Sequence, residues 1–331
     1  MSPAIHKNAP PPVSVCLTTY NRGSVLAATL DSVVSQEMAD FELIISDDNS
    51  TDNTADISLE FAARDNRIRY RCNAVNLKMP GNLNAAIRSA RAPLVANLHD
   101  GDVYRTDLLK LWRQAMDEQP DAAFVWNQLE SVDAHGCHVG LHVHPFGSRI
   151  EPLELTRYML GRLDSPVWGT VMARRACYES DGLFDSRFGF ISDVEMWMRL
   201  NLRHPVAYVA EPLIKITPRE AHHPYAFINW DLEQTLIEIH RSIIDRIHAS
   251  PAQVRERRTA LRSLGRLQVR RWLWLAAVSV SKRRPDLYRQ ALALFRQQEQ
   301  LILKSVGLCG VPLGFFIGKH RRWGETARMR S

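Results

Sequence analysis

Cysteine is scarce in this chain of 331 residues, and its five cysteines stand far apart. They are odd in number and form no Cys-x-x-Cys pair, which argues against a disulfide framework and a zinc ribbon. Long apolar runs are also absent: the stretch that comes closest to a membrane span, residues 308–318, has only 11 residues without a charge. Residues 1–12 contain no apolar segment, so we expect a flexible arm there and not a secretory signal. These absences predict a protein of the reducing cytoplasm.

The remaining composition is that of a folded globular protein, with 45% apolar and 24% charged residues. Its charge is unevenly distributed along the chain. Residues 226–331 contain 20 basic and 8 acidic side chains, whereas residues 1–225 contain 22 basic and 28 acidic ones. We therefore expect two regions with different roles, 13–225 and 226–331.

Short β-branched apolar segments alternate with amphipathic helical patterns along residues 13–225. Strands are expected at 13–17, 41–46, 67–71, 94–98, 122–131, 167–173 and 206–209, and helices at 24–36, around 57–62, at 81–91, 108–118 and 191–203. This alternation predicts an α/β fold, in which helices flank both faces of a mostly parallel sheet. Beyond residue 225 the pattern changes to basic helices at about 228–249, 252–280 and 285–305.

A polar Asp100-Gly101-Asp102 turn directly follows the strand expected at 94–98. In parallel sheets, ligands bind beyond the carboxyl ends of the strands, so the turn is in a ligand-binding position. Two carboxylates at this spacing suit a hard divalent cation that shares its remaining positions with phosphate. An ordinary Asp-Gly turn is the alternative.

The first two strands end in residues that suit a nucleotide. Tyr20 follows the first strand, where its ring can stack on a base, and Asp47 ends the second, where its carboxylate can accept hydrogen bonds from a base or ribose. The alternative for this second polar segment is helix capping, to which we assign at least two of Asp48, Ser50 and Thr51.

Five segments in a fixed order make the chain resemble glycosyltransferase family 2, whose members have the GT-A fold and use nucleotide sugars. The segments are residues 13–22 (VSVCLTTYNR), 43–52 (LIISDDNSTD), Asn76 with 81–84 (GNLN), the Asp-x-Asp at 100–102, and 192–200 (SDVEMWMRL). The resemblance covers about residues 13–225. It implies a metal-dependent inverting transfer of a sugar, from a UDP- or dTDP-linked donor to a hydroxyl of a saccharide or lipid-linked saccharide, in polysaccharide or glycoconjugate assembly.

The resemblance also implies a role for each matching residue. Asp193 matches the catalytic base that deprotonates the acceptor hydroxyl. Asp102 and Asp100 would bind Mg²⁺ or Mn²⁺, with His222 preferred over His223 as a third ligand. The residues that match the donor pocket are Thr18, Tyr20, Arg22, Asp47, Asn76, Asn84 and Asp100. For Asn84 an equal alternative is a structural hydrogen bond at the start of a helix. For His222 and His223 an equal alternative is that both lie in a loop and face the solvent.

Two positions depart from the family pattern. Ser192 stands where the family usually has Glu before the base, and Gly101 stands where many members have a further Asp. These departures leave open a second hypothesis, an inactive GT-A-like protein that binds nucleotide sugars or serves as a scaffold. Glu195 would point away from Asp193 on a helix, so we expect it to support the site and not to act as a second base.

Three other features each allow more than one interpretation. The His-rich segment 133–144 is interpreted as a solvated hairpin, with a zinc site as the minor alternative. Trp168 would either stack on an acceptor sugar or belong to the core. The basic C-terminal region, with Trp272 and Trp274, suits a helical bundle or peripheral contact with the inner face of an anionic membrane. Nucleic acid is disfavoured as its partner.

Overall fold

The computed structural model describes residues 10–133, 135–162, 165–216 and 230–247, together with six isolated positions between 259 and 289. The chain divides after Ile247 into two compact units. The helices predicted at 252–280 and 285–305 lie almost entirely outside the described residues, as do most of the predicted N-terminal arm and the segment with His222 and His223. The helices and strands of the described residues belong to the first unit, which ends at Ile247.

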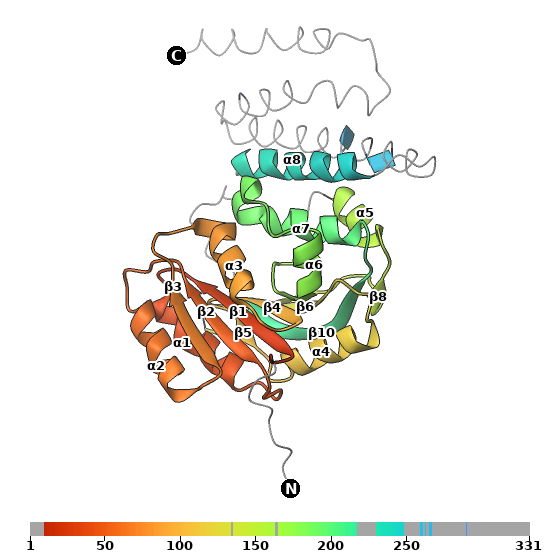
Figure 1. The fold of residues 1–331 in the computed structure, drawn as a ribbon. Helices are drawn as coiled ribbons and strands as arrows, with labels where there is room; N and C mark the ends of the chain where they lie inside the picture. Colours follow the sequence, from red (N-terminus) through yellow and green to blue (C-terminus); the bar gives the residue numbers. More distant parts are fainter. Residues whose placement is uncertain are drawn as a thin grey trace, which may run out of the picture. The chain divides into compact units, whose positions relative to one another are not determined.

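A mixed sheet of ten strands runs through this unit (Figure 1). Its first half is parallel, in the order β3-β2-β1-β4, and continues through β9, β6 and β10 to β5. Strand β9 is antiparallel to both β4 and β6, whereas β6 and β10 are parallel. The strands are β1 (Val13–Thr19), β2 (Glu42–Asp47), β3 (Ile68–Cys72), β4 (Leu94–His99), β5 (Val103–Tyr104), β6 (Phe124–Val132), β7 (His138–His142), β8 (Arg149–Ile150), β9 (Val171–Arg174) and β10 (Val206–Ile216).

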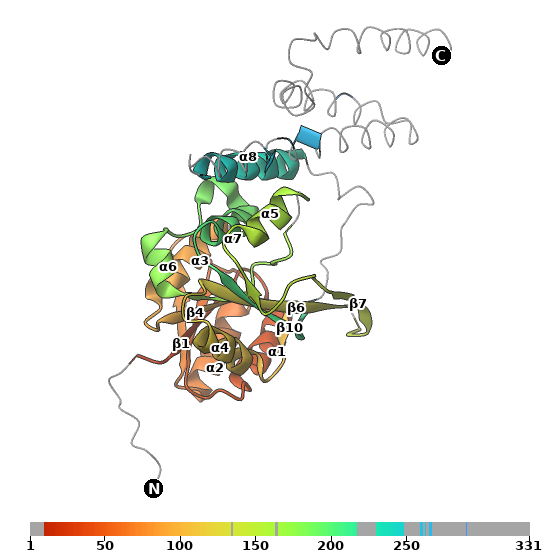
Figure 2. The same cartoon turned by 90° about the vertical axis from the view of Figure 1, so that its right-hand side faces the viewer.

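Helices cover both faces of the sheet, as the alternating pattern predicts (Figures 1 and 2). Helices α1 (Gly23–Val34), α2 (Thr54–Arg64) and α4 (Leu108–Glu118) lie on one face, and α3 (Lys78–Ser89), α6 (Arg175–Ser180) and α7 (Ser192–Asn201) lie on the other. The main core forms under the first group, where Leu30 of α1 and Trp112 of α4 pack on Leu17 and Leu98 of the sheet. All seven residues of β1 are buried because both layers cover this central strand.

Helix α8 (Trp230–Arg246) is part of this unit, although its residues were predicted to belong to a separate C-terminal region. It lies across α7 and α5 (Glu154–Leu160) in both views. His240 of α8 is buried, and its Nε2 is 3.2 Å from the carbonyl oxygen of Met159. The first compact unit thus extends to residue 247. Within the described residues, no helix is long and apolar enough to cross a bilayer.

Candidate functional site

The predicted site residues lie at the edge of the sheet where β1, β2 and β4 end. These neighbouring strands are parallel, so the segments that follow them emerge side by side. Arg22 follows β1, Asp47 is the last residue of β2, and Asp100 follows β4 directly. Strand β9 runs in the opposite direction, so the residues before it, Trp168 and Gly169, come to the same edge. The carboxyl edge therefore collects candidates from separate parts of the chain.

Helix α1 holds the Asp100-Gly101-Asp102 turn in place. The hydroxyl of Thr29 accepts a hydrogen bond from the Gly101 N–H (3.0 Å) and donates one to the Asp102 carbonyl (2.9 Å). On the strand side, the Tyr104 hydroxyl accepts from the His99 N–H (2.9 Å) and donates to the His99 carbonyl (2.8 Å). Because the backbone is bonded on both sides of the turn, the two carboxylates project from a fixed support.

Arg22 explains why glycine occupies position 101. Its Nε is 3.6 Å from Oδ1 of Asp100 and makes no hydrogen bond within the described residues. A Cβ on Gly101 would lie only 2.7 Å from Nη2 of Arg22, and the φ of Gly101 is +90°. A side chain at position 101 would therefore collide with the guanidinium and strain the backbone. Glycine, in place of the Asp that many family members have here, thus leaves room for an arginine beside the Asp-x-Asp turn.

Asp47 and Asp48 are buried, and their carboxylates bond within the chain. Asp47 accepts from the N–H and hydroxyl of Ser50 and from the phenol of Tyr70, the last at 2.8 Å. Asp48 accepts from the Asn73 amide and from the N–H groups of residues 77 and 78. Both carboxylates thus order the loops around the expected donor pocket.

The start of helix α2 is hydrogen-bonded by a different residue from those predicted for the segment after β2. Asn53 is the N-cap of α2 and makes no side-chain capping bond, so the prediction that two of Asp48, Ser50 and Thr51 cap this helix is wrong. Instead, Asp52 accepts from the N–H of Thr54 and from that of Gly23, at the starts of α2 and α1. A hydrogen bond from the Thr54 side chain, assisted by these two backbone N–H groups, lowers the pKa of Asp52. One carboxylate therefore joins both helices beneath the site.

The other predicted donor residues have different surroundings. Thr18 is buried in β1, whereas the Tyr20 ring is 45% exposed. Asn76 accepts a hydrogen bond from the Lys78 N–H. Asn84 lies in the interior of α3 and not at its start; its amide donates to the Phe184 carbonyl (2.9 Å) and accepts from the Phe184 N–H (3.1 Å). For Asn84 the structure thus supports the alternative of a structural hydrogen bond, because its bonds hold a segment 100 residues away.

Asp193, the predicted base, is in the first turn of α7, and burial raises the pKa of its carboxyl to about 7. Its carboxylate lies close to Gly169, as does the ring of His99. A Cβ on Gly169 would lie 3.3 Å from Oδ2 of Asp193 and 3.2 Å from Nε2 of His99. The predicted base and the residue immediately before Asp100 therefore converge on one glycine.

Sequence patterns did not identify His99 as a site residue. The antiparallel register pairs Asn97 of β4 with Val171 of β9. Continued two residues further, this register places Gly169 opposite His99, in agreement with the close approach. This contact could be predicted only from the antiparallel pairing of β4 with β9. The apolar pattern of a strand does not indicate the direction in which it runs, so the pairing could not be predicted.

Glu195 is the centre of a buried ion-pair network on α7. Its carboxylate is fully buried and lies 2.9 Å from Nε of Arg199 and 3.0 Å from Nη1 of Arg246 on α8. The guanidinium of Arg199 also donates to the carbonyl groups of residues 181–183. The network joins α7, α8 and the segment that leads to Asp193, a supporting role consistent with the expectation for Glu195.

Trp168 is 45% exposed, so the alternative of a core tryptophan is wrong. Its ring centroid is 4.8 Å from that of His142 in β7, which pairs with β6 as the predicted hairpin (Figure 2). His144 instead contacts Trp126, and His138 pairs with Glu130. Across the described ranges, no group of three or more His, Cys, Asp or Glu side chains is placed to hold a metal ion.

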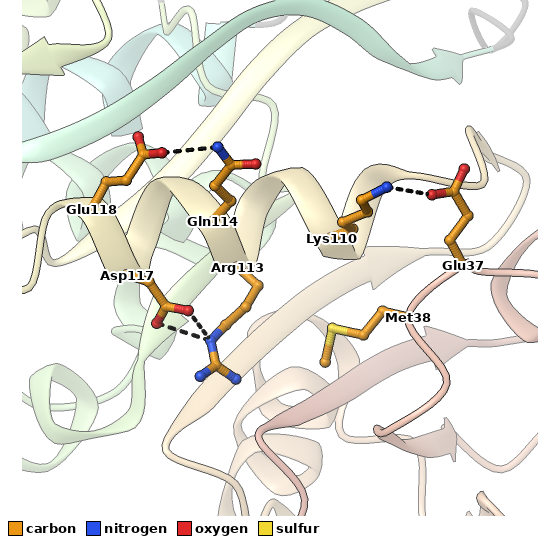
Figure 3. Close-up of a pocket in the computed structure, with 7 residues that line it drawn as sticks. All are labelled: Glu37, Met38, Lys110, Arg113, Gln114, Asp117 and Glu118. Atoms are coloured by element: carbon orange, nitrogen blue, oxygen red, sulfur yellow. Dashed lines mark hydrogen bonds and ion pairs between the residues drawn. The ribbon is translucent and has the colours of Figure 1, made fainter.

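A cavity of about 590 Å³ lies away from this edge, between α4 and the loop after α1 (Figure 3). Residues 37 and 38 lead into the start of β2, and α4 leads into the start of β6. The residues that line the cavity therefore lie toward the amino ends of the strands, away from the carboxyl edge. Its charged side chains pair with one another, as in Lys110 with Glu37 and Arg113 with Asp117. The cavity thus has neither the position nor the unmatched charge expected of a diphosphate site.

The Asp-x-Asp turn is chemically suited to a divalent cation. Asp100 and Asp102 supply hard oxygen ligands at a fixed turn, and both are partly exposed at the ligand-binding edge. The two carboxylates leave most coordination positions to a diphosphate and water, as is usual for Mg²⁺. The residues present therefore fit such an ion, with Arg22 as a second positive charge beside them.

Comparison with known proteins gives a family match and several relatives. The model for glycosyl transferase family 2 matches residues 14–179. The uncharacterized protein MT1568 of Mycobacterium tuberculosis is 28% identical over 214 residues, which are 62% of this chain and 66% of that protein. The UDP-Glc:alpha-D-GlcNAc-diphosphoundecaprenol beta-1,3-glucosyltransferase WfgD of Escherichia coli is 29% identical over 133 residues, 40% of this chain and 51% of WfgD. The chain thus spans about half to two thirds of these relatives.

Solved structures share the fold. S. aureus TarS 1-349, in complex with UDP-GlcNAc, superposes with a TM-score of 0.63 at 17% sequence identity, over 88% of this chain and 81% of that one. At this identity the likeness concerns the fold alone. It confirms the predicted GT-A architecture, a mixed sheet with flanking helices.

Proposed function

Because this chain belongs to glycosyl transferase family 2, we propose that it transfers a sugar from a nucleotide diphosphate sugar to a hydroxyl group of a saccharide or lipid-linked saccharide. One observation carries the proposal: His99, next to the Asp-x-Asp turn, and Asp193 approach the same glycine. A donor held at the turn and an acceptor at the base would then meet at this point. The name of the relative WfgD supports this class of substrates. It specifies UDP-Glc as the donor and a sugar linked to diphosphoundecaprenol as the acceptor.

Asp193 is the proposed general base. Its carboxylate would take the proton of the acceptor hydroxyl as that oxygen attacks the anomeric carbon, while the bond to the diphosphate breaks on the opposite side. A single displacement of this kind inverts the anomeric configuration. A base with a pKa near 7 suits this task, because it is largely ionised just above neutral pH yet still basic enough to accept a proton.

The donor would lie along the carboxyl ends of β1, β2 and β4. Tyr20 offers an exposed ring for the base, and Arg22 offers a cation for the diphosphate. Thr18, Asn76 and Asp100 would line the same pocket. We assign Asp47 and Asn84 to shaping this pocket, because hydrogen bonds within the chain engage their side chains.

Asp100 and Asp102 would hold Mg²⁺ or Mn²⁺, with His222 as the proposed third ligand. Such an ion supplies positive charge to the departing nucleoside diphosphate. The proposed donor is UDP- or dTDP-linked, and the proposed process is polysaccharide or glycoconjugate assembly in the cytoplasm.

Thermal denaturation with nucleotides tests the donor and metal assignments together. UDP, GDP, CDP and dTDP would each be added with and without Mn²⁺. The preferred nucleotide should stabilise the chain by about 2.7 kcal/mol at a hundred times its Kd. Asp102→Asn should remove the part of this stabilisation that depends on Mn²⁺. Asp117→Asn should keep it, because Asp117 lies on α4 and is not part of the Asp-x-Asp turn. A wild-type response that is identical with and without Mn²⁺ would contradict metal dependence.

The C-terminal region suggests peripheral contact with the inner face of a membrane. This proposal rests on sequence alone: residues 308–318 carry no charge and are followed by a basic cluster with Trp323. The full chain should sediment with anionic liposomes, and a chain lacking residues 306–331 should not. Equal sedimentation of both chains would refute this contact.

A further inference from the structure

Polar side chains lie among the leucines and valines on the buried side of α1 and just beyond its end. Thr29 is fully buried, and Ser32 and Gln36 are at most 8% exposed. All three hydrogen-bond to the backbone of residues 101–109. Buried polar groups cost stability unless they are paired, and these are paired with the segment that contains the Asp-x-Asp turn. The three residues thus form a polar seam between α1 and that segment.

Thr29 is the member of the seam that bonds to the turn itself. Its hydroxyl donates its only proton to the Asp102 carbonyl (2.9 Å) and accepts from the Gly101 N–H (3.0 Å). A threonine inside a helix can instead donate to a carbonyl of the preceding turn of the same helix. The hydroxyl of Thr29 is committed to a segment 72 residues further along the chain. Ser32 and Gln36 bond to residues 104–109, which follow the turn.

The turn lies along one face of α1. Arg22 is the N-cap of this helix, and Val25 and Thr29 follow at intervals of three and four residues, so the three share a face. A Cβ on Gly101 would lie 2.7 Å from Nη2 of Arg22 and 3.8 Å from Cγ2 of Val25. One helix therefore determines the position of the Arg22 cation and, through Thr29, that of the two carboxylates of the turn.

We propose that Thr29 is a positioning residue for the divalent cation, because its two hydrogen bonds hold the backbone from which Asp100 and Asp102 project. This inference rests on the proposed function and adds to it a residue that acts through the turn. Loss of the hydrogen bonds that orient metal ligands typically lowers metal affinity about 10–100-fold. If Thr29 served the fold alone, its loss would lower the free energy of unfolding and leave metal affinity unchanged.

Binding of Mn²⁺ to the full chain tests the inference without requiring turnover. The electron paramagnetic resonance signal of free aqueous Mn²⁺ would be followed in titrations with UDP, GDP, CDP or dTDP present. Thr29→Val keeps the shape of the side chain but removes the hydroxyl, and it should weaken Mn²⁺ binding about tenfold or more. Thr29→Ser keeps the hydroxyl and should bind Mn²⁺ nearly as tightly as the wild type does.

Thr156→Val is the matched control. Thr156 on α5 is also fully buried, and its hydroxyl donates to the Met198 carbonyl of α7 at 3.0 Å. Both valine variants should lower the midpoint of urea denaturation, because each loses a hydroxyl and leaves a buried partner unpaired. Only Thr29→Val should also lose affinity for Mn²⁺.

Equal Mn²⁺ affinity of Thr29→Val and the wild type would overturn the inference, and so would an equal loss of affinity in Thr156→Val. A wild type that binds no Mn²⁺ with any of the four nucleotides would overturn it together with the metal site. Failure of the proposed function has a different signature. A wild type that binds Mn²⁺ and a nucleotide but neither hydrolyses nor transfers from any nucleotide sugar would refute that function, while weaker Mn²⁺ binding by Thr29→Val would still support the role of Thr29.

Discussion

Replacing Asp193 with Asn should reduce sugar transfer by about 10²–10⁴-fold and at the same time make the folded chain more stable at pH 8. Asn is nearly the same size but cannot accept the acceptor proton, so the chemical step loses its base. Nucleotide binding should be unchanged, since the donor is held by other residues. Transfer assays at saturating donor, with UDP titrations alongside, would measure the two effects separately.

The stability effect follows from the raised pKa of Asp193. In the folded chain this pKa is about 7, whereas an aspartate in an unfolded chain has a pKa of about 3.9. Between these pH values the folded chain binds a proton that the unfolded chain has lost. The wild type therefore loses free energy of unfolding as the pH rises from about 4 to about 7. The amide of the Asp193→Asn variant cannot ionise, so the variant avoids this loss.

Urea denaturation at pH 4 and pH 8 would test this prediction. The stability of Asp193→Asn relative to the wild type should increase from pH 4 to pH 8. Wild-type transfer should also fall about tenfold for each pH unit below 7, because only the ionised base is active. A variant that keeps more than a tenth of wild-type transfer, or a relative stability equal at both pH values, would argue against the assignment of Asp193 as a base with a raised pKa.

Glu195→Gln should destabilise the fold by about 3–5 kcal/mol. Glu195 is fully buried between two arginines, at 2.9 Å from Arg199 and 3.0 Å from Arg246. Glutamine is similar in shape but neutral, so both guanidinium groups would lose their counter-charge, and Arg199 would remain buried. The loss should appear as a lower midpoint of urea denaturation, measured at pH 7.

A matched control is available on α4. Arg113 and Asp117 form an ion pair with the same spacing of four residues, but both side chains are at least 36% exposed (Figure 3). Asp117→Asn should cost no more than about 0.5 kcal/mol, because water solvates the separated charges. Equal losses in Glu195→Gln and Asp117→Asn would show that burial does not strengthen the α7 network.

Sequence patterns predicted the elements whose apolar spacing is regular. The strand expected at 94–98 is β4, the helix expected at 108–118 is α4 with the same bounds, and the first three strands also form. The position of Asp100 and Asp102 after β4 could be predicted for the same reason, because a buried strand must end where a polar turn begins.

Relations between distant segments could not be predicted in this way. The contact of His99 with Gly169 depends on β9 running antiparallel to β4, and a short strand pattern has the same appearance in either direction. The bonds of Asn84 to Phe184 similarly join residues 100 positions apart. Helix α8 was grouped with the basic C-terminal region by its charge, but charge describes the solvent-facing side, and the buried side of α8, with Ile243 and Ile244, determines where it packs.

The close approach of Arg22 to Gly101 links two positions that are far apart in the sequence. An Asp at position 101 would occupy the space of the guanidinium, whereas a smaller residue at position 22 would leave room for it. Natural variation at these positions should therefore be correlated: relatives with Asp at the middle of the turn should lack Arg at the position of Arg22. Two lineages of the family would then stabilise the same leaving diphosphate differently, one with an additional carboxylate at the turn and the other with a permanent cation from the first loop.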